Sequence, residues 1–257
     1  MPTHVNNIVI GSGKIYLALF DGSNVRGGFR YFGDTPGLSV QITTERVTVY
    51  GADLSSKYKM VDKVTQVDRE FTVTARDVSP PNTALFFGGD AVDLAQSTGT
   101  GETAVLTGVD QGLWYLIGKA VQATGVRNIT AVAVADGAVT YDIDTDYELD
   151  LARGRIYIVE GGGIADGDDI TVTYDAPANT RSQVSTTDQV SRKAALHFVA
   201  DNSEGENSDL LIPYCELSPD GEFSFKDLEN AVEMGFIGKI LTLDSNTPQM
   251  YVDGVAT

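Results

Sequence analysis

The sequence predicts a mainly-β protein. We expect a β-barrel or β-sandwich with one short flanking helix and a long projecting hairpin, plus an inserted small β-sandwich domain. Short runs of alternating apolar and polar residues recur along the chain, which is typical of strands with one buried face. Turn-forming residues separate these runs, and no long helical pattern is present. A hydrophobic content of 42% over 257 residues is enough for a core.

The first two strands are expected near the N-terminus, after a polar start over residues 1–13. Lys14–Phe20 alternates so that Ile15, Leu17 and Leu19 share one face. Gly27–Gly33 is a second strand bounded by glycines.

Residues 38–78 contain a long hairpin around which we expect the chain to be organised. Both flanks of this stretch alternate as strands do. Along the first flank, the apolar residues switch from one face of the strand to the other. This switch suggests a bulge or bend near Thr44–Glu45, where the strand leaves the sheet. One face carries Leu38, Val40 and Ile42, and the other carries Val47 and Val49.

The middle of the hairpin, Gly51–Val67, is too long for a tight turn and shows no clear helix or strand of its own. Residues 45–69 hold five cations and four carboxylates, whereas the whole chain has a net charge of −18. We therefore interpret this stretch as an arm that docks on an acidic copy of the same chain. A solvated flexible loop is the alternative. The expected inter-subunit residues are Tyr50, Leu54, Lys57, Tyr58, Lys59, Met60, Lys63 and Arg69.

One helix is predicted directly after the hairpin, within Val78–Gly89. Ser79 can cap it, two prolines fit its first turn, and two glycines end it. Leu85 with Phe86 or Phe87 is expected to pack this helix on a sheet.

The composition then changes, and residues 93–180 are interpreted as an acidic inserted domain with 14 acidic and 4 basic residues. Residues 95–107 are small and polar, as a linker or loop would be. Short alternating runs with turns between them then predict a β-sandwich. These runs are Trp114–Ile117, Ile129–Ala135, Val139–Ile143, Tyr147–Leu151, Arg155–Val159 and Ile170–Tyr174. The first domain would then be discontinuous, over 1–92 and 181–257.

The first domain resumes after the insert. The predicted strands are Lys193–Ala200, Leu210–Leu217, Glu222–Lys226 and Phe236–Leu243, and Met250–Val252 is expected to close the sheet. Asp227–Met234 reads as a helical turn or a loop.

No catalytic, cofactor-binding or metal-binding constellation stands out. The run Gly11–Lys14 lacks the frame of a phosphate-binding loop, and Gly161–Gly163 is a turn between strands. Five carboxylates alternate over Asp142–Asp150 without the glycine and glutamate of a calcium loop, so a solvated strand face is preferred to a cation site. Cys215 is expected to be a buried structural thiol. The two histidines, His4 and His197, form no triad or metal cluster that the sequence reveals.

The charge of −18 disfavours ordinary nucleic-acid binding, in which Lys and Arg neutralise phosphates. It fits either simple solubility or a surface that lies near DNA without binding it. No stretch approaches the ~20 apolar residues of a membrane span.

Several of these patterns together resemble the tail tube (major tail) proteins of long, non-contractile-tailed bacteriophages. The resemblance covers roughly residues 10–92 and, more loosely, 190–257. It depends on the run Gly13–Phe20, the run Phe29–Leu38, the long hairpin and the Ser79–Phe86 helix. Residues 146–175 look like the extra β domains of some members.

The resemblance implies a tail-tube-type β-barrel or sandwich whose copies form hexameric rings that stack into a hollow tube. It implies no enzyme and no cofactor. Residues 51–67 match the polymerisation loop by position, and an acidic lumen would let DNA pass without sticking. Other partners would be the tape measure, tail tip and terminator proteins. The protein would be made in the host bacterial cytoplasm and reside in the virion. Many members of that family lack an insert at this place, so the resemblance does not predict the role of the insert.

Two other classes of protein remain open. The first is a carbohydrate- or cell-surface-binding β-sandwich, with stacking platforms from Trp114, Tyr115, Tyr141, Tyr147 and Tyr157. The second is an acidic β-rich enzyme that uses carboxylates.

Overall fold

The computed structural model of the protein describes residues 8–21, 24–53, 55–189 and 191–254. Strands dominate this part of the chain, and its one helix has seven residues. The mainly-β class with a single short helix is therefore confirmed. The chain divides into two compact units: unit 1 runs up to Val92 and resumes at Val184, and unit 2 is Asp93–Gln183. Unit 2 thus begins where the sequence places the insert and ends three residues later.

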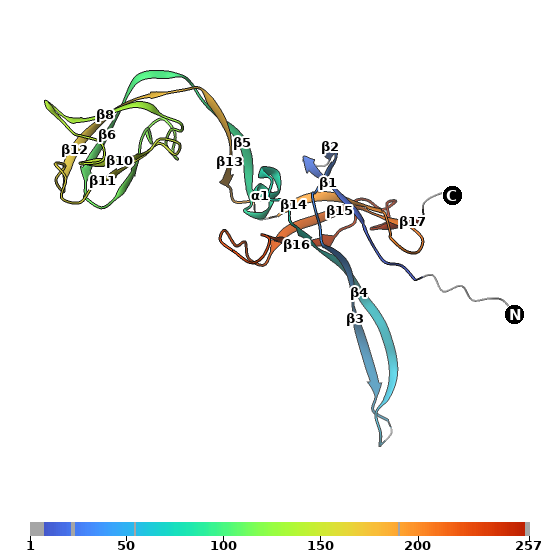
Figure 1. Cartoon of the computed structure of the whole chain (residues 1–257). Helices are drawn as coiled ribbons and strands as arrows, with labels where there is room; N and C mark the ends of the chain where they lie inside the picture. The colour runs from blue at the N-terminus through green and yellow to red at the C-terminus, as the bar shows by residue number, and fades with distance from the viewer. Residues whose placement is uncertain (1–7, 22–23, 54, 190, 255–257) are drawn as a thin grey trace. The chain divides into compact units, whose positions relative to one another are not determined.

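Unit 1 is built on one eight-stranded antiparallel sheet (Figure 1). Seven strands follow each other in the order β2-β1-β14-β15-β16-β4-β3, and β17 pairs with β15. Their bounds are β1 (Gly13–Asp21), β2 (Asn24–Tyr31), β3 (Gly37–Gly51), β4 (Tyr58–Ala75), β14 (Arg192–Ala200), β15 (Ser208–Asp220), β16 (Met234–Ile240) and β17 (Tyr251–Gly254). The sheet is open, so β2 and β3 are its outer strands, and the expected closing segment at Met250–Val252 is β17.

The core of unit 1 comes from one face of this sheet and from the helix. Period-two alternation buries Ile15 and Leu17 of β1, and Phe71 and Val73 of β4, in one cluster, whereas Thr72 between the last two is exposed. Phe236 of β16 lies in the same cluster. Burial of such side chains is the main source of stability in a sheet with one covered face.

Helix α1 (Pro80–Phe86) follows the predicted pattern, with prolines in its first turn and buried Ala84, Leu85 and Phe86. The predicted cap is wrong in one respect: Ser79 occupies the N-cap position, but its side chain makes no capping hydrogen bond. The buried Asn82 amide instead ties the helix to the sheet, because its Nδ2 donates to the carbonyl of Phe32 at 2.9 Å.

Unit 2 has a separate hydrophobic core between two antiparallel sheets. The four-stranded sheet comprises β6 (Gly99–Val109), β12 (Asp168–Ala176), β8 (Thr130–Asp136) and β9 (Val139–Thr140). The three-stranded sheet comprises β10 (Tyr147–Asp150), β11 (Arg155–Ile158) and β7 (Trp114–Leu116). The chain enters unit 2 along β5 (Gly89–Gln96) and returns along β13 (Asn179–Thr186), and these two strands pair with each other.

Three sequence-based expectations about local structure are wrong. Residues 95–107 are largely strand, because β6 pairs along β12 despite its polar and glycine-rich composition. Glu222–Lys226 is part of an irregular connection over residues 221–233. The carboxylates of Asp142–Asp150 do not share a strand face, because the chain turns over residues 144–146 and β10 begins only at Tyr147.

Candidate functional site

A two-stranded arm extends beyond the sheet of unit 1 (Figure 1). Strand β16 pairs with β4 only as far as Glu70, and past this point β3 and β4 pair solely with each other among the described residues. We call residues 41–69 the arm. The expectation that Gly51–Val67 has no regular structure is wrong, because β4 begins at Tyr58 and the connection is only Ala52–Lys57.

Two β-bulges interrupt the pairing of the arm. The register shifts between Glu45 and Arg46 and again between Val49 and Tyr50, which leaves Thr65 and Met60 of β4 as the extra residues. The first shift lies next to the position predicted from the parity change. Each bulge breaks the alternation of β4, so the distal half of β4 carries no clear strand pattern in sequence. Alternation along β3 continues unbroken and assigns the two faces of the arm.

One face of the arm, which we call the charged face, pairs two cations with one carboxylate. Nε of Arg46 donates to Oδ1 of Asp62 at 2.9 Å, and Nζ of Lys59 donates to Oδ2 of the same carboxylate at 2.6 Å. The hydrogen bonds from Arg46 and then Lys59 lower the pKa of Asp62 from 3.8 to about 2. The three side chains form an ion cluster on an exposed ribbon.

The opposite face, which we call the apolar face, is different in character. Val49 and Val61 lie directly opposite each other and are both about half exposed. Val47 stands opposite Lys63, and Tyr58 stands opposite Gly51. Its ring lies so close to Gly51 that a Cβ there would be 2.4 Å from Cζ of Tyr58. Lys63 makes no salt bridge with any residue that the structure describes.

The remaining predicted arm residues lie in several different settings. Tyr50 pairs with Lys59 on the charged face, and Met60 is the exposed extra residue of the second bulge. Lys57 ends the exposed connection. Arg69 lies at the base of the arm, where its guanidinium donates to Oε1 of Gln249 at 2.6 Å. Leu54 lies outside the described residues.

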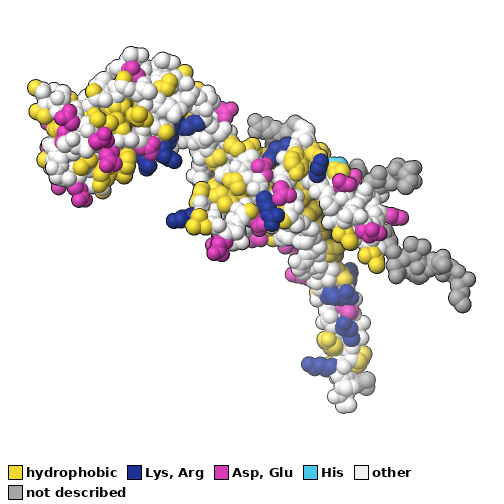
Figure 2. Space-filling view, in the orientation of Figure 1, with side chains coloured by type: hydrophobic (Ala, Val, Ile, Leu, Met, Phe, Trp, Pro, Cys, Tyr) yellow, Lys and Arg dark blue, Asp and Glu magenta, His cyan; other side chains and the backbone are white. Residues whose placement is uncertain are grey.

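Val61, Asp62 and Arg46 were not predicted as arm contacts. The period-two pattern of β3, which places Val47 and Val49 on one face, was the sequence feature that could have indicated them. Figure 2 shows Lys and Arg side chains in dark blue along the arm, with hydrophobic side chains in yellow towards its end.

Other candidate sites give less evidence of a function. Burial raises the pKa of the Cys215 thiol to about 12, so the prediction of a buried structural cysteine is confirmed. The Asp146 carboxylate of the acidic run accepts hydrogen bonds from the backbone N–H groups of Asp142 and Gly163, which lower its pKa.

Within the described ranges, no group of three or more His, Cys, Asp or Glu residues is placed to hold a metal ion. No helix in the same ranges is long and apolar enough to cross a membrane.

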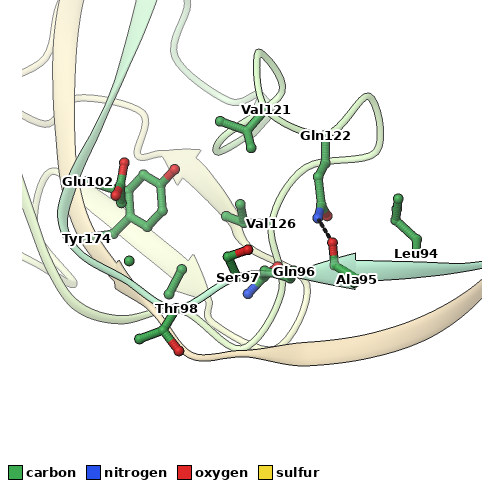
Figure 3. Close-up of a pocket in the computed structure, with 12 residues that line it drawn as sticks. Leu94, Ala95, Gln96, Ser97, Thr98, Glu102, Val121, Gln122, Val126 and Tyr174 are labelled. Atoms are coloured by element: carbon green, nitrogen blue, oxygen red, sulfur yellow. Dashed lines mark hydrogen bonds between the residues drawn. The ribbon is translucent and has the colours of Figure 1, made fainter.

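Unit 2 contains a cavity of about 280 Å³ beside β5, β6 and β12 (Figure 3). Glu102, Tyr174 and Ser97 bring polar atoms to it, and Val121 and Val126 supply apolar walls. Nε2 of the buried Gln122 donates to the carbonyl of Ala95 at 3.3 Å, whereas its Oε1 has no partner among the described atoms. The space is large enough for several water molecules, which such an oxygen would bind.

A wider groove of about 510 Å³ lies in unit 1 near the base of the arm. Its lining is mainly apolar and includes Leu38, Val40, Phe198, Leu210, Met250 and Val252.

The fold and the site thus define a mainly-β protein with an inserted β unit and an exposed, two-faced hairpin arm. The chain belongs to the family described as Protein of unknown function UCP028589, whose model matches residues 8–247. No curated protein matches the sequence.

Proposed function

We propose that the protein is a structural subunit that assembles with copies of itself through the arm into the hollow tube of a phage tail. The observation that carries this proposal is the arm itself. A ribbon whose valines and tyrosines remain exposed in the single chain has apolar surface to bury against a partner. A second copy is the simplest partner, because the chain is strongly acidic and the arm is not.

The open sheet adds support. The outer strands β2 and β3 each have one edge without a partner among the described strands. Unpaired edges present backbone N–H and C=O groups that a neighbouring chain can complete. A ring of subunits would satisfy both edges at once, which stabilises a closed assembly.

Charge supports the conduit part of the proposal. The net charge of −18 gives the assembled wall a potential that repels a polyanion, so DNA would pass without binding. Unit 2 carries 14 acidic and 5 basic residues, which is half of this net charge. Its separate core fits an added domain that assembly does not require.

Shortening the arm tests the proposal. Glu45 and Gln66 are directly paired, so deleting residues 46–65 and inserting Asn-Gly closes the hairpin with a two-residue turn. We expect wild-type chain to form tubes in electron micrographs. The shortened chain should remain a folded monomer, by circular dichroism and sedimentation velocity. Tubes from the shortened chain would contradict the role of the arm, and a wild-type chain that stays monomeric would contradict the function.

One observation favours a second candidate, carbohydrate binding by unit 2. Trp114 is 45% exposed on the three-stranded sheet, with the guanidinium of Arg155 4.6 Å from its ring and the ring of Tyr157 5.3 Å away. Across the sheet, Glu148 stands opposite Tyr157 and Asp150 opposite Arg155. Aromatic rings beside carboxylates suit a neutral sugar, which stacks on the ring and donates hydroxyl hydrogen bonds.

The other aromatic residues contribute less to such a platform. Tyr147 is buried, and the hydroxyl of the half-buried Tyr115 accepts a hydrogen bond from the backbone N–H of Asp110. Trp114 is the single tryptophan of the chain, so its fluorescence reports directly on this face. Neutral oligosaccharides should quench it in a saturable way that Tyr157→Ala weakens. Unchanged fluorescence at high sugar concentration would exclude this candidate.

A further inference from the structure

The connection between β15 and β16, residues 221–233, displays two strongly exposed apolar side chains. Phe225 is 82% exposed and Leu228 is 93% exposed. We call this segment the acidic loop. Oδ1 of Asp227 accepts hydrogen bonds from the backbone N–H groups of Glu229 at 2.9 Å and Asn230 at 3.1 Å. These bonds fix the turn that carries Leu228.

The acidic loop is fastened to the core of unit 1 through aromatic contacts. The ring of Phe225 stacks on that of Phe87 at 5.8 Å and meets the ring of Phe223 edge-on at 4.6 Å. Phe223 in turn lies 5.8 Å from the buried Phe86 of α1. The exposed ring is therefore the outermost member of a rigid cluster, and it offers a prepared surface to a partner.

Carboxylates surround the two apolar side chains. The loop contains four acidic residues and one lysine. A hollow of about 340 Å³ lies beside it, lined in part by Glu222, Asp227 and Glu233. Glu233 is paired with Arg76 at 2.9 Å, whereas Glu222 and Asp227 form no salt bridge within the described ranges. The surface thus combines two exposed apolar side chains with two carboxylates that form no salt bridge among the described residues.

The apolar face of the arm has the complementary features. Beyond the first bulge it presents Val47, Val49, Val61 and Tyr58. Its one charge there is Lys63, which makes no salt bridge with any described residue. On the charged face, by contrast, Arg46 and Lys59 are both already hydrogen-bonded to Asp62 and are less free to pair with a partner. A polyanion or an anionic lipid surface would be repelled by the acidic loop.

We propose that the acidic loop is the docking site for the apolar face of the arm of a second copy of this chain. This proposal rests on the proposed function, and it names the surface that receives the arm. Phe225 and Leu228 would pack on the valines of the arm. Lys63 would pair with the carboxylates of the hollow, and the charged face would remain in solvent.

The first test compares two serine variants by sedimentation velocity and electron microscopy. Phe225→Ser with Leu228→Ser should raise the concentration needed for assembly more than tenfold, without changing the circular dichroism spectrum. Val252→Ser is the matched control, since this valine is 67% exposed and lines the groove near the base of the arm. It should assemble like the wild type.

The second test reverses charges. Lys63→Glu and Glu222→Lys should each weaken assembly, and the two together should restore most of it, since a new pair of opposite sign forms.

The outcomes separate the two proposals. Wild-type tubes together with normal assembly of the Phe225→Ser, Leu228→Ser variant would overturn the docking site alone. Loss of assembly in Val252→Ser, with the loop variant unaffected, would place the arm in the groove instead. A wild-type chain that never assembles would overturn the proposed function and the docking site with it.

Discussion

Nε of Arg46 on β3 donates a hydrogen bond to Oδ1 of Asp62 on β4, across the arm, at 2.9 Å. The same carboxylate also receives a hydrogen bond from Lys59. One face of the arm therefore holds Arg46 and Lys59 in hydrogen bonds to Asp62, while the other leaves Val49 and Val61 exposed side by side. We expect the second face to be the one that is buried in an assembly.

The ion cluster predicts an unusual titration of Asp62. Its carboxyl should titrate at a pKa of about 2 instead of the ordinary 3.8. Because the pKa is lower in the folded arm, the stabilising contribution is fully present above the unfolded value and is lost as the pH falls through about 2. Carbon-13 NMR of the side-chain carboxyl measures this directly. Arg46→Gln should raise the midpoint, and a midpoint near 3.8 in the wild type would show that the cluster does not form.

The apolar face predicts sensitivity to isosteric polar substitution. Val49→Thr with Val61→Thr keeps the shape and the β-propensity of the strand pair but adds hydroxyl groups to the buried contact. The concentration required for assembly should rise about tenfold or more, which corresponds to about 1.4 kcal/mol. Light scattering over a dilution series measures it.

A substitution on the charged face is the matched control for this variant. Asp62→Asn should assemble within about threefold of the wild type, since that face is expected to stay in solvent. If both variants assemble equally well, or if Asp62→Asn is the weaker one, the assignment of the two faces is wrong.

Unit 2 should be dispensable for folding of unit 1 and for assembly. Replacing Asp93–Gln183 by a short Gly-Ser linker cuts β5 and β13 but removes no residue of the unit 1 core. The shortened chain should unfold in one cooperative transition and still form tubes. A folded chain that forms no tubes would show that unit 2 takes part in the contacts between copies.

A glycine in the main sheet predicts a local cost in stability. Gly238 of β16 is paired with Phe71, and a Cβ there would lie 2.0 Å from the ring. Gly238→Ala should therefore lower the free energy of unfolding by roughly 1–3 kcal/mol, as overpacking does. Gly28→Ala is the control, because nothing lies within 4 Å of its Cβ position. Equal urea midpoints for the two variants would contradict this packing.

The strands of unit 1 and the helix were predictable because simple patterns describe them. Ile15 and Leu17 alternate with outward residues, and the two prolines before Ala84 mark the helix start. The distal half of β4 was not predictable in this way. Thr65 and Met60 are extra residues, and each shifts the alternation by one position, so the strand appears irregular. Strand β6 was missed because its glycines and threonines resemble a loop, and only its pairing with β12 defines it.

The arm was found from charge and length, but its two faces depend on register. The sequence contains Arg46, Lys59 and Asp62 without revealing that they meet, because the bulge at Met60 lies between them along the hairpin. The exposure of Phe225 and Leu228 was equally hidden. Phe225 lies in Glu222–Lys226, which alternates well enough to predict a strand. Leu228 lies in Asp227–Met234, which was expected to be a helical turn or a loop, and local hydrogen bonds to Asp227 hold its turn.

A cryo-electron microscopy reconstruction of the particles formed by the purified chain would show where the arm of each copy lies. We expect a hollow, six-fold tube in which the apolar face of each arm is buried against the next copy and Val49 and Val61 are covered. Arms that extend freely into solvent, or a chain that remains monomeric at high concentration, would contradict it.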